Sequence, residues 1–235
     1  MENQIKGLTI RVHDHGFVRL VDWMGSDTSI VEAARVSYKS PSKGEEADKK
    51  LLTYLFKNKH SSPFEMAKIQ FNIKMPIFVM RQYIRHRMQN LNEFSARYKE
   101  LPDEFFIPKE FRKQATTNKQ SSEPSPDVDQ VFCSNHVKEL YGYCYRTYQL
   151  LLSAGVAREQ ARIVLPVGIY TEFYACWDMN NLVKYFALRD DPHAQGEHQD
   201  YARAMKEITK RVFPWTMEVY EGVKFVMKEE MKIPV

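Results

Sequence analysis

The segment from Lys68 to Pro76 places the firmest constraint on the fold, because it is the clearest strand in the sequence. Apolar and polar side chains alternate through it, with Ile69, Phe71, Ile73 and Met75 on one side and Lys68, Gln70, Asn72 and Lys74 on the other. Alternation of this kind puts one face of a strand in the core and the other in water. Pro76 ends a hydrogen-bonded ladder but suits the first turn of a helix. The sequence therefore predicts a strand that leads directly into a helix.

The helix predicted after Pro76 covers about residues 77–90. Steps of three and four give it an apolar stripe for the core, made of Ile77, Met80, Ile84, Met88 and Leu91. The opposite face presents polar side chains, namely Arg81, Gln82, Arg85, His86 and Gln89.

Periodicity and the positions of Gly and Pro predict the other elements. A strand covers 18–22, Ser26 or Asp27 caps a helix that runs to Val36, and a second helix covers about 48–57. Further helices are expected at about 131–153, 156–165, 178–188 and 194–212. Residues 39–50 are expected to form a solvated loop and 113–129 a mobile excursion. The prediction is an α+β (α/β) fold, in one domain spanning 1–235, with a small mixed or antiparallel sheet and predominant helices.

Composition limits the functional classes. A chain of 235 residues with 43% apolar and 27% charged residues is typical of a globular protein. It holds no apolar run long enough to span a membrane, and residues 1–11 lack the apolar core of a signal peptide, so a cytoplasmic protein without a membrane partner is expected. The net charge of +4 is too small to indicate a nucleic-acid partner. Three widely spaced cysteines, expected to be buried, indicate neither a disulfide framework nor a metal site.

A basic segment follows the predicted helix. Successive side chains in a helix point about 100° apart, so Arg85, His86 and Arg87 can bind two neighbouring anions on different sides. If the chain is extended beyond them, Glu93, Ser95 and Arg97 point the same way, which suits a phosphate and a ribose hydroxyl. A solvent-facing basic helix followed by a loop is the alternative from composition alone.

The segment Arg85-His86-Arg87, seven residues, then Ser95 and on to Arg97-Tyr98, resembles the signature motif of flavin-dependent thymidylate synthases. Further blocks resemble that family in the same order, namely Ala34–Ser37, His60–Glu65, Glu159–Pro166 and Leu188-Arg189. The resemblance spans roughly residues 17–215. It implies reductive methylation of dUMP to dTMP, with methylenetetrahydrofolate as carbon donor, NADPH as reductant and FAD as cofactor. It also implies a homotetramer with its sites where subunits meet.

The resemblance implies a role for each matching residue. The dUMP contacts are expected at Gln82, Arg85, Glu93, Phe94, Ser95, Ala96, Arg97, Arg162 and Arg189. The FAD contacts are expected at Ser62, Arg85, His86, Arg87, Met88, Glu93, Asn180 and Lys184, with Ser37 and Asn92 as weaker candidates. Arg189 is the expected catalytic residue, because a fixed guanidinium beside the uracil favours the ionised ring. Tyr54 and His60 are candidates for lining the folate or nucleotide pocket.

The sequence departs from the family pattern near the predicted FAD contacts. Asp178 and Asn180 stand where the family has Asn and Arg, and Lys184, one turn after Asn180, is our hypothesis for the replacement charge. Ser95 has no neighbouring base, so we interpret it as a ligand for the substrate rather than a nucleophile. The rival interpretations are a nucleic-acid-binding module that uses the same arginines and a nucleotide-binding flavoprotein of different chemistry.

Overall fold

The computed structural model describes residues 5–37, 39–116 and 121–230. Its centre is a five-stranded sheet in the order β1-β2-β3-β7-β4, and every pairing in it is antiparallel. The strands are β1 (Thr9–Val12), β2 (Gly16–Met24), β3 (Lys68–Pro76), β4 (Asn90–Glu93) and β7 (Tyr170–Asp178). With helices making up most of the remaining described elements, the predicted class of mixed helix and antiparallel sheet is confirmed.

The strand predicted from alternation lies in the middle of the sheet. The predicted core face of β3 is fully buried, with 0% exposure at Ile69, Phe71, Ile73 and Met75. The other face is not uniformly wet, because Asn72 is buried as well. Its side chain accepts a hydrogen bond from Arg19 and donates one to the carbonyl of Phe173, so its polar atoms are paired.

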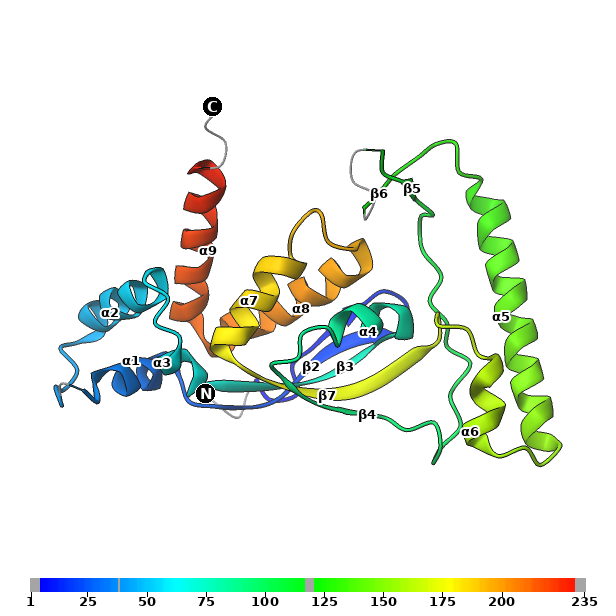
Figure 1. Ribbon diagram of the computed structural model, residues 1–235, viewed down its shortest axis with the longest axis horizontal. Helices are drawn as coiled ribbons and strands as arrows, with labels where there is room; N and C mark the ends of the chain where they lie inside the picture. Colours follow the sequence, from blue (N-terminus) through cyan, green and yellow to red (C-terminus); the bar gives the residue numbers. More distant parts are fainter. Residues whose placement is uncertain (1–4, 38, 117–120, 231–235) are drawn as a thin grey trace.

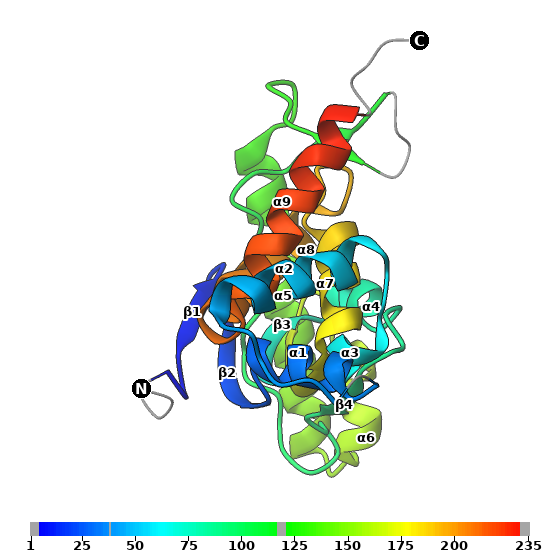
Figure 2. The ribbon, with the colours of Figure 1, turned by 90° about the vertical axis from the view of Figure 1, so that its left-hand side faces the viewer.

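One face of this sheet is covered by helices that lie above it in Figure 1, namely α4 (Ile77–Tyr83), α7 (Met179–Arg189) and α8 (Gly196–Val212). A second group gathers at one end of the molecule: α1 (Asp27–Arg35), α2 (Glu45–Lys57), α3 (Ser62–Glu65) and α9 (Pro214–Glu230). Within it α2 and α9 lie side by side (Figure 2). Buried Asp27 joins α1 to α9, because its carboxylate accepts from the backbone N–H groups of Trp215 and Thr216.

The long helix α5 (Gln130–Ser153) stands apart at the other end of the molecule (Figure 1). It contacts α6 (Arg158–Ala161) and the 3-10 turn η2 (Arg162–Val164), and Tyr148 is its one buried residue. The expected excursion at 113–129 contains a short hairpin of β5 (Lys113–Gln114) and β6 (Ser122–Glu123), while its residues 117–120 lie outside the described part. Across the described residues, no helix is both long and apolar enough to cross a bilayer.

The predicted helix over 77–90 is wrong in its second half. α4 ends at Tyr83, and residues 90–93 pair as β4 with β7. The expected core residues Ile84, Met88 and Leu91 are accordingly 40%, 68% and 36% exposed. The reason is long-range, because the backbone of 90–93 gains ladder hydrogen bonds from a strand about eighty residues later.

Other differences are smaller. Ser26 caps α1 as predicted, through a capping box with Ser29. The helix expected at 156–165 is a short α6 followed by a 3-10 turn, residues 45–50 are helical rather than loop, and α9, β1 and β7 were not predicted. The three cysteines are free but only partly buried, so full burial of each was a wrong expectation.

Candidate functional site

A cavity of 290 Å³ collects most of the residues expected to bind the nucleotide. Among those that line it are Glu93, Phe94, Ser95, Ala96, Arg97 and Arg162. β4 positions the first of them, and the N–H of Phe94 continues the pairing by donating to the carbonyl of Glu172. The chain then turns, with the N–H of Tyr98 donating to the Ser95 carbonyl at 3.1 Å. The sequence motif therefore forms one wall of a cavity.

The carboxylate of Glu93 is held from behind by a residue that was not predicted from the sequence. The hydroxyl of Thr171, on β7, donates to Glu93 Oε1 at 2.7 Å and lines the same cavity. A carboxylate has two acceptor oxygens, and this bond uses only Oε1. The signal available in the sequence was the alternation of β7, which was not recognised.

The two arginines that line this cavity, Arg97 and Arg162, both contact Glu159. Arg97 Nε pairs with Glu159 Oε2 at 3.1 Å, and Arg162 Nε donates to the Glu159 carbonyl at 3.4 Å. The Glu159 carboxylate is thus bound by Arg97, whereas Arg162 bonds to the Glu159 backbone. Both contacts use Nε, so the terminal nitrogens of two arginines remain for an anion such as a phosphate.

A second cluster forms at the carboxyl end of α4, around Arg189. Arg189 Nε donates to His86 Nε2 at 2.8 Å. Burial, and secondarily the charge of Arg189, lowers the pKa of His86 to about 4, so the imidazole is neutral and accepts this bond. The bond fixes the guanidinium plane and leaves its terminal nitrogens unengaged by His86. Burial also lowers the pKa of Arg189 itself.

Aromatic and amide groups support this cluster from the core. The ring of Tyr185 packs edge-on to His86 with centroids 4.9 Å apart. Its hydroxyl meets His198 Nε2 at 3.0 Å, and His198 Nδ1 meets Gln82 Oε1 at 2.8 Å. His198 was not among the predicted site residues, although a histidine on the buried face of α8 beside Tyr201, Ala202 and Met205 was visible in the sequence.

The two clusters do not share the 290 Å³ cavity. Of the predicted nucleotide contacts, Gln82, Arg85 and Arg189 are absent from the lining of the 290 Å³ cavity in the described structure. The predicted nucleotide contacts therefore fall into two groups, one on the turn after β4 and one around α4 and α7.

Two of the predicted FAD contacts, Arg87 and Met88, line a separate cavity of 260 Å³. It is lined by Lys68, Arg87, Met88, Gln89, Asn90, Cys176 and Asp178. Arg85 and Arg87 are exposed, and two neighbouring cations suit a diphosphate. Ser62 begins α3, and Lys184 is exposed on α7.

The two departures from the family pattern have structural roles here. Asp178 caps α7 by accepting from the N–H of Asn181 at 2.9 Å. Asn180 donates to Glu65 Oε1 at 3.4 Å, a contact that links α7 to α3. The Ala-Arg-Val-Ser block is also structural, since Arg35 binds Asp48 and the carbonyl of Pro41 and so ties α1 to α2.

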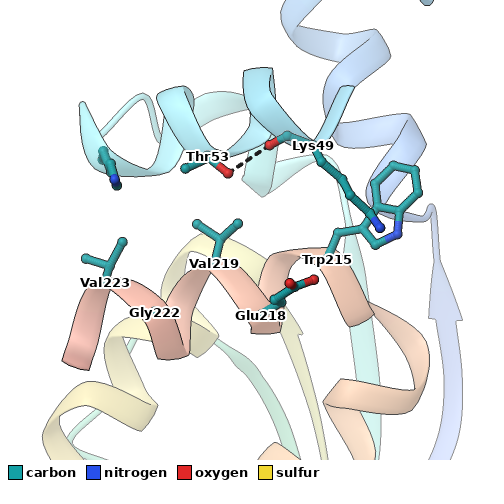
Figure 3. Close-up of a pocket in the computed structure, with 8 residues that line it drawn as sticks. Lys49, Thr53, Trp215, Glu218, Val219, Gly222 and Val223 are labelled. Atoms are coloured by element: carbon teal, nitrogen blue, oxygen red, sulfur yellow. Dashed lines mark hydrogen bonds between the residues drawn. The ribbon is translucent and has the colours of Figure 1, made fainter. Parts of the chain in front are cut away.

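A further cavity, of 660 Å³, opens between α2 and α9 (Figure 3). It is lined by Lys49, Thr53, Lys57, Trp215, Glu218, Val219, Gly222 and Val223, none of which was a candidate site residue. Lys49 lies over the ring of Trp215, with Nζ 5.0 Å from its centroid. This cavity is larger than the 290 Å³ cavity but holds none of the predicted site residues. The candidate site is therefore identified by its charged and polar side chains and not by its volume.

Comparisons with known proteins identify the family of this chain. The profile of the family described as thymidylate synthase complementing protein matches residues 19–215. A flavin-dependent thymidylate synthase from Thermus thermophilus is 47% identical over 214 residues, covering 91% of this chain and 78% of that protein. One from Dictyostelium discoideum is 44% identical over 230 residues, covering 92% and 75%.

A solved structure has the same fold. The UMP/dUMP methylase PolB from Streptomyces cacaoi, bound with 5-Br dUMP, superposes with a TM-score of 0.82 at 31% identity, covering 91% of this chain and 97% of that one. The two relatives are named as flavin-dependent thymidylate synthases, and the solved structure is that of a UMP/dUMP methylase. The chain belongs to the flavin-dependent thymidylate synthase family.

Proposed function

We propose that this chain converts dUMP to dTMP, taking the carbon from methylenetetrahydrofolate and the reducing electrons from NADPH by way of bound FAD. The observation that carries the proposal is the 290 Å³ cavity, whose wall joins a carboxylate, a serine turn and two arginines. That set matches a nucleoside monophosphate, with the phosphate at Ser95, Arg97 and Arg162 and a sugar hydroxyl at Glu93.

The residues present also fit a flavin dinucleotide. Arg85 and Arg87 supply cations for its diphosphate. Arg87 and its neighbour Met88 also line the 260 Å³ cavity. His86, Ser62, Glu93, Asn180 and Lys184 complete the proposed set of contacts. FAD, when bound, supplies the hydride that makes the overall methylation reductive.

Arg189 is the residue we assign to activation of the uracil ring. Its guanidinium is fixed by His86, so its position does not depend on the substrate. Placed beside the pyrimidine, a preorganised positive charge stabilises the ionised ring and raises the nucleophilicity of its carbon. His86 serves this role as a neutral acceptor, and its low pKa keeps it neutral at physiological pH.

We also propose that the single domain of residues 1–235 assembles as a cytoplasmic homotetramer. The exposed apolar residues Phe132, Tyr143 and Leu150 are spaced so that they share one face of α5. A face of this kind on an otherwise exposed helix suits a second copy of the chain. Assembly would also bring the Ser95 cavity of one copy to the Arg189 cluster of another.

Mixing two variants tests this shared site. Arg162→Ala and Arg189→Ala are each expected to be nearly inactive, but a mixed tetramer contains sites that pair a wild-type Arg162 with a wild-type Arg189. Co-refolded or co-expressed mixtures should therefore regain activity. If every site lay within one chain, each would carry a substitution and mixing would restore nothing.

The reaction itself is tested by tritium release from dUMP labelled at carbon five, with methylenetetrahydrofolate and NADPH present. Purified protein should carry the absorbance of oxidised flavin and release tritium only with the complete mixture. A yellow protein that binds dUMP without releasing tritium would indicate a flavoprotein of different chemistry. A colourless protein that binds nucleic acid would remove the proposal.

The replacement role of Lys184 has its own test. Lys184→Ala should weaken FAD binding more than Lys57→Ala, which removes another exposed helical lysine, at the α2–α9 cavity. Equal affinities in the two variants would show that Lys184 takes no part in holding FAD.

A further inference from the structure

Three side chains from three helices form one hydrogen-bonded chain behind the nucleotide site. Tyr185 (α7), His198 (α8) and Gln82 (α4) are joined by contacts of 3.0 Å and 2.8 Å. Tyr185 and His198 are both 0% exposed, whereas Gln82 is only partly buried. The hydrogen-bonded chain therefore begins at a fully buried tyrosine and ends at Gln82, which is partly exposed.

The direction of the hydrogen bonds follows from the burial of Tyr185. Its hydroxyl hydrogen needs an acceptor, and His198 Nε2 is the one that the described structure offers. A neutral imidazole that accepts at Nε2 carries its proton on Nδ1. Burial, followed by the charge of Arg189 and the proximity of His86, lowers the pKa of His198 to about 3, so a second ring proton is absent at neutral pH.

We propose that His198 is a positioning residue for nucleotide binding: its Nδ1–H donates to Gln82 Oε1 and commits the amide NH₂ of Gln82 to an acceptor atom of the nucleotide. A free glutamine amide can turn over and present either its oxygen or its nitrogen. An oxygen turned outward would face an anionic ligand and oppose its binding. The inference rests on the proposed function, because it takes the ligand of Gln82 to be dUMP.

The relay also places Gln82 relative to Arg189. Tyr185 bonds to His198 and packs its ring against His86, which in turn accepts from Arg189. Tyr185 thus supports both His198, which holds the amide of Gln82, and His86, which orients the guanidinium of Arg189. The positions of Gln82 and Arg189, which are both expected to contact the nucleotide, therefore depend on the same buried residues.

The direct test is a double-mutant cycle on dUMP binding to the flavin-loaded protein. His198→Leu keeps the approximate size of the ring but removes its donor, and should weaken dUMP binding about tenfold while turnover of bound substrate changes little. His198→Asn retains both a donor and an acceptor, and should recover most of the affinity. In a Gln82→Ala background, His198→Leu should cause no further loss, because its effect passes through Gln82.

The contrary results are distinct. An undiminished loss from His198→Leu in the Gln82→Ala background, or unchanged affinity in His198→Leu alone, would overturn the relay while leaving the enzyme reaction intact. Wild-type protein that fails to bind dUMP would overturn both the relay and the proposed function.

A second measurement needs no change in the core. Nitrogen-15 NMR of histidine-labelled wild-type protein, with His198→Asn used for assignment, should show His198 protonated at Nδ1 and not at Nε2. The opposite tautomer would refute the proposed direction of the relay, whatever the binding constants.

Discussion

Buried His198 makes the stability of this protein depend on pH below about 6.5. In the folded chain its pKa is about 3, because burial disfavours the charged ring, whereas an unfolded histidine has a pKa of about 6.5. Between these values the unfolded state binds a proton that the folded state does not. The stabilisation is therefore complete above about pH 6.5 and declines as pH falls toward 3.

The size of the effect can be worked out for a change from pH 7 to pH 5. Linkage with these two pKa values gives a loss of about 2 kcal/mol in the free energy of unfolding. The figure is nearly independent of the folded pKa, provided that it lies well below 5. His198→Leu has no such proton to bind and should lose about 2 kcal/mol less than wild type over the same interval.

The two proteins should therefore converge in acid. At pH 7 the variant leaves the Tyr185 hydroxyl and Gln82 without their partner and should be less stable by roughly 1–3 kcal/mol. At pH 5 that gap should largely close. Urea unfolding at both pH values and one protein concentration measures it, because the proposed assembly would make stability concentration-dependent.

Exposed His60 provides the matched control. His60→Leu should lose as much stability as wild type between pH 7 and pH 5, because it leaves His198 in place. Equal losses in wild type and His198→Leu would refute the reasoning, since they would show that His198 has no depressed pKa in the folded state.

Other changes test other parts of the structure. Arg189→Ala should retain flavin absorbance and lose at least ~100-fold in tritium release; a wild-type rate would refute its assigned role. Ser95→Ala should weaken dUMP binding about tenfold with some activity left, whereas complete inactivity at normal dUMP affinity would indicate a nucleophile. Asp27→Ala removes the acceptor for Trp215, Thr216 and the Thr216 hydroxyl, and should lower the free energy of unfolding by roughly 2–4 kcal/mol in urea titrations; an unchanged midpoint would show that Asp27 does not tie α9 to α1.

The parts of the fold that could be predicted are those whose signal is local. Alternation identified β3, and Ser26 identified the start of α1, because each depends on residues a few positions apart. β7 has the same alternation, with Phe173, Ala175 and Trp177 buried at steps of two, so it too was predictable from a local pattern.

The end of α4 was not predictable in this way. Ile84, Met88 and Leu91 keep helical spacing, yet they are exposed because residues 90–93 pair with a distant strand. No local pattern states where a backbone will find its hydrogen-bond partner. The buried partners of the site residues were hidden for the same reason, since Thr171 and His198 are distant in sequence from Glu93 and Gln82.

The motif at 85–98 is continuous in sequence, but its two ends make different contacts in the structure. Glu93 to Arg97 line a cavity with Arg162, while His86 accepts a hydrogen bond from Arg189. A signature can be contiguous for reasons of chain geometry: its two ends lie on different elements, the turn after α4 and the strand β4. If copies of the chain assemble as proposed, one short segment contributes to two sites at once. A substitution within the motif would then damage two sites in each pair of subunits, whereas a substitution of Thr171 or His198 would disturb only the half-site that it supports.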